Sequence, residues 1–127
     1  MASTNTYDKE SLFVSQLMEQ LGKLHGVEIR KAPVADYGVD LLVVEPNSGK
    51  RIAIECKSAG DYGELPISTI LPIARLVKND PNQQVILVSF SSVSDLLSTK
   101  LKELNVPSLT KPTVKQVVDQ VQLALSA

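Results

Sequence analysis

The stretch that most constrains the fold is GVDLLVVEPNSGKRIAIECKS, residues 38–58, in which two apolar runs flank the turn-forming residues PNSG. Apolar and β-branched residues dominate both runs, which predicts two strands joined as a hairpin. Apolar strands of this kind are normally buried, and buried positions normally exclude charge. Asp40 nevertheless opens the first run, and Glu55 and Lys57 close the second.

The hairpin register predicts that these charges gather at one place. If residues 46–49 form the turn, Asp40 lies directly opposite Glu55, where Cβ atoms are about 4.5–5.5 Å apart. Lys57 points to the same face as Glu55, because side chains alternate along a strand, and Cys56 points to the other face. One spot on one face of the sheet is therefore expected to hold two acids and a lysine.

Two opposed carboxylates destabilise a sheet unless something compensates their charge. A divalent cation such as Mg²⁺ (or Mn²⁺) would do so, with Asp40, Glu55 and the backbone carbonyl of Cys56 as oxygen ligands. Lys57 would then stabilise developing negative charge or orient a water molecule. The simpler alternative is that Asp40 only starts a strand while Glu55 pairs with Lys57 or Arg51.

The remaining periodicity predicts helices on both sides of further strands. Apolar spacing indicates a helix over residues 9–24, ended by Gly26. The other expected elements are a strand over 27–32, a helix over 68–79 with Pro72 in its first turn, a central parallel strand over 83–90, a helix over 92–104 capped by Ser92 or Ser94, a short strand over 106–110 and a helix over 113–125. We expect one α/β domain over residues 1–127, with an αβββαβ core (about 9–91), a mixed central sheet flanked by helices, and a C-terminal α-β-α extension (92–127).

Composition excludes several classes of function. Thirteen basic and fourteen acidic residues give a net charge of −1, so no global basic field indicates a nucleic-acid partner. A lone cysteine and the lack of a signal peptide or membrane span predict a cytoplasmic protein without membrane contact. A single histidine cannot build a zinc site, and the absence of a phosphate-binding loop disfavours a nucleotide-binding domain.

Asp40 followed by Glu55-Cys56-Lys57 resembles the D…(D/E)xK signature of the PD-(D/E)XK nuclease superfamily, and the predicted αβββαβ order resembles its common core. The likeness covers about residues 10–90, and the nearest members in layout are archaeal Holliday-junction resolvases and small nuclease domains of type IV restriction enzymes. The resemblance implies Mg²⁺-dependent hydrolysis of DNA phosphodiesters, with both acids as metal ligands. Val39 stands where many members have proline, a change that removes no ligand.

Many members of the superfamily carry a further acid on the first helix. Helical spacing places Glu10 on the stripe of Leu17 and Leu21 that faces the sheet, whereas Glu19 faces solvent. Glu10 is therefore a candidate catalytic residue, or alternatively a first-turn carboxylate that favours the helix dipole.

Four further residues are candidates for DNA contact: Arg30, Lys31, Ser58 and Arg75. Their side chains could bind phosphates near the motif, although each alone also fits a solvated surface. We expect a structure-specific DNA endonuclease that works as a homodimer. The alternative is a catalytically inactive nuclease-fold module that binds nucleic acid or a partner protein, which the near-neutral charge favours.

Overall fold

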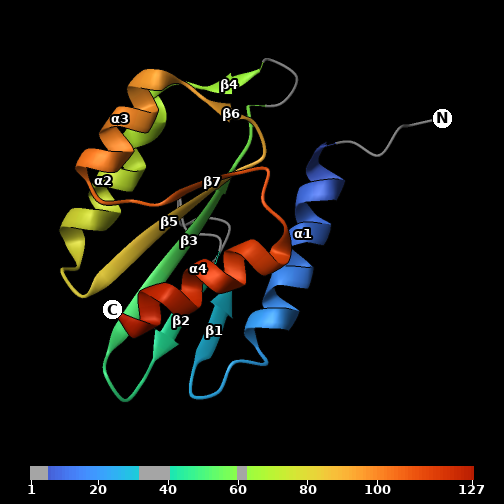
Figure 1. Cartoon of the computed structure of the whole chain (residues 1–127), viewed down its shortest axis with the longest axis vertical. Helices are drawn as coiled ribbons and strands as arrows, with labels where there is room; N and C mark the ends of the chain where they lie inside the picture. Colours follow the sequence, from blue (N-terminus) through green and yellow to red (C-terminus); the bar gives the residue numbers. More distant parts are fainter. Residues whose placement is uncertain (1–5, 32–40, 60–62) are drawn as a thin grey trace.

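The computed structural model describes residues 6–31, 41–59 and 63–127 (Figure 1). The elements follow the predicted order αβββαβ and then α, β and α, and the structure adds β4, η2 and β6. Their bounds are α1 Thr6–Leu21, β1 Glu28–Lys31, β2 Leu41–Glu45, β3 Lys50–Lys57, β4 Glu64–Leu65, the 3₁₀ helix η2 Ile67–Thr69, α2 Ile70–Asn79, β5 Gln83–Ser89, β6 Ser92–Val93, α3 Asp95–Glu103, β7 Ser108–Thr110 and α4 Val114–Ser126.

Five strands form the main sheet, in the order β1-β2-β3-β5-β7. β1, β2 and β3 pair in antiparallel fashion, whereas β5 runs parallel to both β3 and β7. The predicted mixed sheet is thus confirmed, with β5 as an interior parallel strand and the short strand before α4 as an edge. β4 and β6 pair with each other in a small separate sheet that the sequence did not predict.

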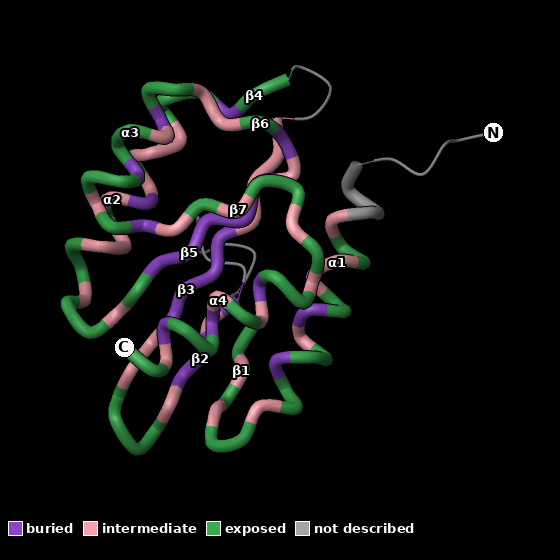
Figure 2. The backbone as a smooth tube through the Cα atoms, viewed as in Figure 1, coloured by how far each residue is buried: buried purple, intermediate pink, exposed green. Residues whose placement is uncertain are grey.

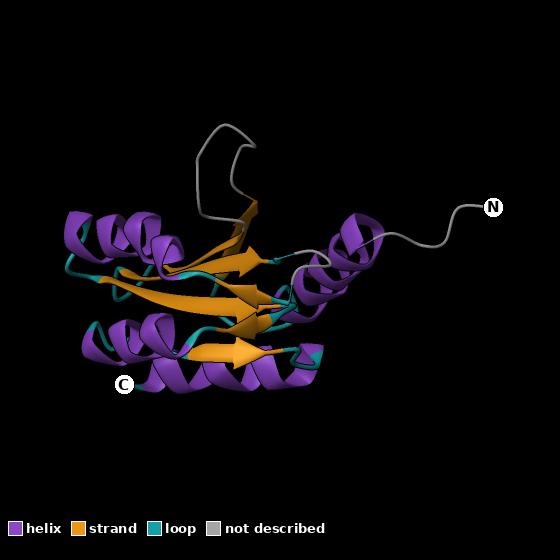
Figure 3. Ribbon diagram, turned by 90° about the horizontal axis from the view of Figure 1, so that it is seen from above, coloured by secondary structure: helices purple, strands orange, loops and turns teal. Residues whose placement is uncertain are grey.

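Helices cover both faces of the main sheet (Figure 3), and each face has its own apolar core. Residues of α1 and α4 pack with Ile52 and Ile54 of β3 on one face, which we call the α1/α4 face. Residues of α2 and α3 pack with Ala53 on the other, the α2/α3 face. Most of the buried residues of this sheet belong to β2, β3 and β5 (Figure 2).

The hairpin has the predicted register throughout its described pairs, from Glu45 opposite Lys50 to Leu41 opposite Ile54. The turn closes with the Gly49 amide, which donates to the Glu45 carbonyl at 2.9 Å. Gly49 has a φ of 77°, a left-handed conformation that glycine adopts without steric cost.

α1 begins and ends earlier than the sequence predicted. It stops at Leu21, the last residue of this helix in the core, because Gly22 is a poor helix former and the next residues close short turns. The Leu24 amide, for example, bonds back to the Leu21 carbonyl at 3.0 Å. Gly26 does have a positive φ, of 79°, but it lies in the turn before β1, so its predicted role as the helix terminator is wrong.

The N-terminal ends of α2 and α3, on the other face, also differ from the prediction. A 3₁₀ turn precedes α2, and Pro72 is the third residue of the helix, where its missing amide proton would have no helical partner. α3 begins later than predicted because Ser92 and Val93 belong to β6. Of the two predicted caps, Ser94 is the one used, and its side chain accepts a hydrogen bond from the Leu97 amide.

Candidate active site

The carboxyl end of β3 carries a buried acid beside a lysine. Glu55 is completely buried, with an exposed fraction of 0%, at the point where β3 pairs with β5. The Nζ atom of Lys57 lies 3.3 Å from Oε1 of Glu55, and 35% of the lysine side chain is exposed. A buried carboxylate is costly unless it is paired or binds a metal, and this lysine supplies a paired charge next to solvent.

Alternation along β3 separates this pair from the cysteine between them. Cys56 packs with the core of the α1/α4 face, as predicted, while Glu55 and Lys57 share the side of Ala53. The amide of Arg51 and the carbonyl of Lys57 both bond towards the β5 side. Cys56, which alternates with them, therefore directs its carbonyl towards the β2 side of the strand.

Asp40, the other predicted metal ligand, lies outside the described residues. The register that is described ends one pair short of it, at Leu41 opposite Ile54. The position of Asp40 opposite Glu55 therefore stays a prediction. Within residues 6–31, 41–59 and 63–127, no three His, Cys, Asp or Glu side chains gather as a metal site would require.

Glu10 belongs to α1, which packs on the opposite face from Glu55. One turn further along the helix, the Phe13 ring meets the Phe90 ring edge to face, with centroids 5.2 Å apart. The Phe90 amide donates to the Lys57 carbonyl, so Glu10 lies near the carboxyl end of the sheet. No described residue donates a hydrogen bond to the buried Oε1 atom of Glu10.

The predicted phosphate-contacting residues lie at different places. Arg30 is opposite Leu42 on β2 and so shares the face of Glu55, whereas Lys31 points to the other face. The guanidinium of Arg30 is already 3.1 Å from Glu28. Arg75 is exposed on α2. Of the two pairings in the simpler alternative, the one between Glu55 and Lys57 is present, whereas Arg51 lies 3.4 Å from Asp80 instead.

Sequence reasoning missed two buried serines next to Lys57. Ser89 is fully buried opposite Lys57, and Ser91 is 5% exposed just after β5. Ser91 contacts Ser58 at 3.4 Å between hydroxyl oxygens. The signal was present in the sequence SFSS, which directly follows an apolar strand, because ligand sites in α/β folds lie beyond the carboxyl ends of parallel strands.

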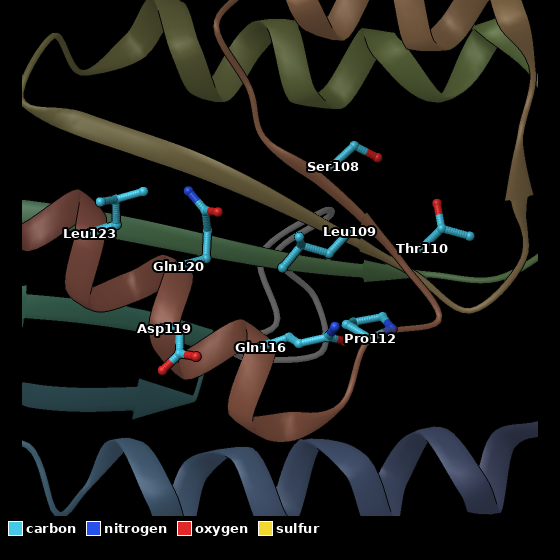
Figure 4. A pocket seen from close by; sticks show the side chains of 8 residues that line it. All are labelled: Ser108, Leu109, Thr110, Pro112, Gln116, Asp119, Gln120 and Leu123. Carbon is cyan, nitrogen blue, oxygen red and sulfur yellow. The ribbon is translucent and has the colours of Figure 1, made fainter.

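A separate groove runs between the edge strand β7 and α4 (Figure 4). Its volume is about 540 Å³, and Leu109, Gln116, Asp119 and Leu123 are among its lining residues. Leu109 and α4 pack on the α1/α4 face, so this groove is on the other side of the sheet from Glu55 and Lys57.

The sequence is matched by the model of a known family. The model of the restriction endonuclease family matches residues 9–107, which is most of the chain. The chain belongs to the restriction endonuclease family. The predicted resemblance to the PD-(D/E)XK nuclease superfamily is thereby confirmed. No curated protein is significantly similar to the chain in sequence.

Two solved structures share the fold of this restriction endonuclease family member. A protein of unknown function, AF1548, is 16% identical with a TM-score of 0.54, over 87% of this chain and 67% of that one. The MspJI restriction endonuclease in complex with a 27-mer oligonucleotide is 11% identical with a TM-score of 0.53, over 83% of this chain. This chain spans only 26% of the MspJI chain.

In the described parts of the chain, no helix is long and apolar enough to cross a membrane.

Proposed function

We propose that this protein is a metal-dependent DNA endonuclease and that the carboxyl end of β3 is its active site. One observation carries the proposal: a completely buried glutamate, Glu55, has the ammonium of Lys57 3.3 Å away on the same face of the sheet. Membership of the restriction endonuclease family gives the class of reaction. The substrate, the metal and the residue roles below are proposals.

The residues available fit a hard divalent cation such as Mg²⁺ or Mn²⁺. Asp40 and Glu55 offer carboxylate oxygens, and the Cys56 carbonyl, directed towards the β2 side, offers a third oxygen. Burial of Glu55 limits the competing hydration of its charge. When bound, the cation would polarise a phosphodiester and lower the pKa of a water molecule.

Lys57 has the geometry of an electrostatic stabiliser. Its side chain is only partly buried, so the ammonium can reach solvent and a bound phosphate while remaining near Glu55. The Lys57 ammonium would stabilise the negative charge that develops on the phosphate oxygens. Glu10 lies on the other face, so it could serve this site only around the carboxyl end of the sheet, where its buried Oε1 atom would accept a water proton.

DNA would be held by basic and hydroxyl groups around the site. Arg30, on the face of Glu55, and Ser58, next to Lys57 in the chain, would contact phosphates at the site, and Lys31 and Arg75 would contact more distant phosphates. We further propose that residues 1–127 act as one unit and that a homodimer cuts a symmetric, branched substrate.

Cleavage of supercoiled, branched and single-stranded DNA with Mg²⁺ or Mn²⁺ tests the proposal. We expect cutting that chelation abolishes and that Asp40→Ala or Glu55→Gln reduces at least about a hundredfold, the scale of a lost catalytic electrostatic interaction. Glu103→Gln is the matched control, because Glu103 is an exposed acid that also pairs with a lysine. Full activity of both site variants, folded by circular dichroism, would refute the site.

The second candidate is an inactive nuclease-fold module that binds nucleic acid or a partner protein. The net charge of −1 favours it, because DNA enzymes usually present a basic surface. Calorimetric titration with Mn²⁺, alone and with DNA, separates the two candidates. The endonuclease binds Mn²⁺ at millimolar concentration or below and loses this binding in Glu55→Gln, whereas the module binds none.

A further inference from the structure

Two hydrogen bonds fasten the end of β3 to the chain that follows β5. The pairing of these strands ends with Lys57 opposite Ser89, and the Phe90 amide then donates to the Lys57 carbonyl at 2.9 Å. Beyond that point a side chain replaces the backbone partner. The amide of Ala59 donates to the hydroxyl oxygen of Ser91 at 2.9 Å.

The Ser91 hydroxyl is itself held in place. The Ser91 amide donates to the Ser89 hydroxyl at 3.2 Å, and that hydroxyl donates to the Ser91 carbonyl. Ser58 adds a contact of 3.4 Å between hydroxyl oxygens. Ser89 and Ser91 are both buried, and a buried hydroxyl costs free energy unless it is hydrogen-bonded. Each of these bonds therefore resists opening.

We infer that Ser91 is a positioning residue for the proposed nuclease reaction. It acts through the backbone: by holding Ala59, it keeps the last residues of β3 extended, so that Lys57 stays 3.3 Å from Glu55. Without the Ser91 hydroxyl, the Ala59 amide loses this acceptor, and the chain just beyond Lys57 is held less firmly. This inference rests on the proposed function.

The test compares Ser91→Ala with Ser91→Thr, which keeps a hydroxyl, and with Ser92→Ala, an exposed neighbour. For metal-dependent cleavage of a DNA oligonucleotide, we expect Ser91→Ala to lower kcat about fivefold to tenfold, the rate equivalent of one hydrogen bond. KM should change less than kcat, since Ser91 is not itself one of the proposed DNA contacts. Ser91→Thr should recover most of kcat, and Ser92→Ala should match the wild type.

Amide hydrogen exchange provides a readout that needs no activity. In Ser91→Ala, the Ala59 amide should exchange at least about fivefold faster, because its acceptor is gone, while Ser92→Ala leaves it unchanged. Wild-type kcat in Ser91→Ala, or unchanged exchange at Ala59, would overturn the inference. An inactive wild type would instead refute the proposed nuclease function, and the exchange rates would still decide whether Ser91 fixes the strand end.

Discussion

The unequal burial of Glu55 and Lys57 predicts that the two partners contribute unequally to stability. At 3.3 Å and an effective dielectric constant of about 20, two unit charges attract by about 5 kcal/mol. Desolvation of the fully buried carboxylate opposes most of that gain. Lys57→Met would leave a buried charge without its lysine, whereas Glu55→Gln would leave an ammonium that is 35% exposed and can be hydrated.

Removing one partner of a buried pair costs about 3–5 kcal/mol. We expect somewhat less for Lys57→Met, a fall of about 1–3 kcal/mol in the free energy of unfolding, because solvent reaches this pair through the lysine. Glu55→Gln removes the buried charge itself, so it should cost about 1 kcal/mol or less. Both variants should lose nuclease activity. Urea unfolding at pH 7 and a cleavage assay measure the two effects separately.

Lys100→Met is the matched control for Lys57→Met. Lys100 lies 3.2 Å from Glu103, nearly the same separation, but both side chains are more than half exposed. The same substitution there should change stability by at most about 0.5 kcal/mol. If Glu55→Gln destabilised the protein more than Lys57→Met, Glu55 would serve the fold through its charge, and its proposed place in an active site would lose its physical basis.

Four other substitutions test the packing that supports the site. Lys50→Met should cost about 1 kcal/mol and speed amide exchange in the last turn of α4, because Nζ of Lys50 donates to the Leu125 carbonyl at 2.7 Å; unchanged exchange would contradict this. Thr113→Ala should cost about 0.5–2 kcal/mol in urea unfolding through loss of the capping box of α4, and a neutral result would show that the box contributes nothing. Ile73 is in the buried core, so Ile73→Ala should lower the free energy of unfolding by about 2–5 kcal/mol. Leu71 on the same helix is 63% exposed, so Leu71→Ala should change that free energy by at most about 0.5 kcal/mol. Equal losses in the two variants would contradict the assigned face of α2.

The hairpin was predictable because two independent signals agreed. The turn residues PNSG fixed where the chain reverses, and slipping the register by one residue would have moved the apolar set to the wrong face. Glu45 and Lys50 consequently face each other as predicted. The same logic identified β5, whose β-branched, apolar run fits an interior parallel strand.

Elements that depend on tertiary contacts were missed. β4 and β6 have two residues each, and they exist only because Glu64 and Ser92 are brought side by side, so no local periodicity could reveal them. The end of α1 was misplaced for a related reason. Leu24 continues the apolar spacing and packs against the core, but from a turn instead of a helix.

The candidate site was only partly predictable, because sequence alternation gives the face of a residue but not its burial. Alternation placed Glu55 and Lys57 together and Cys56 apart. It could not show that Glu55 is completely buried while Lys57 reaches solvent. Burial here depends on the helices that cover β3, and their packing is set by residues distant in the sequence.

The proposed site lies where the regular pairing of the sheet ends, and this location has a physical reason. Within a parallel ladder, backbone groups are satisfied by neighbouring strands, and the side chains of Ile52, Ala53 and Ile54 belong to the two cores. At the last pairs, the backbone of Lys57 is still fixed by β5, yet its side chain is free to meet solvent. A charged group can therefore be held rigidly and still contact a substrate only at this boundary. Ser91 binds the amide of Ala59, two residues beyond Lys57. The backbone is therefore held past the end of the strand, which is why we propose Ser91 as the residue that positions the lysine.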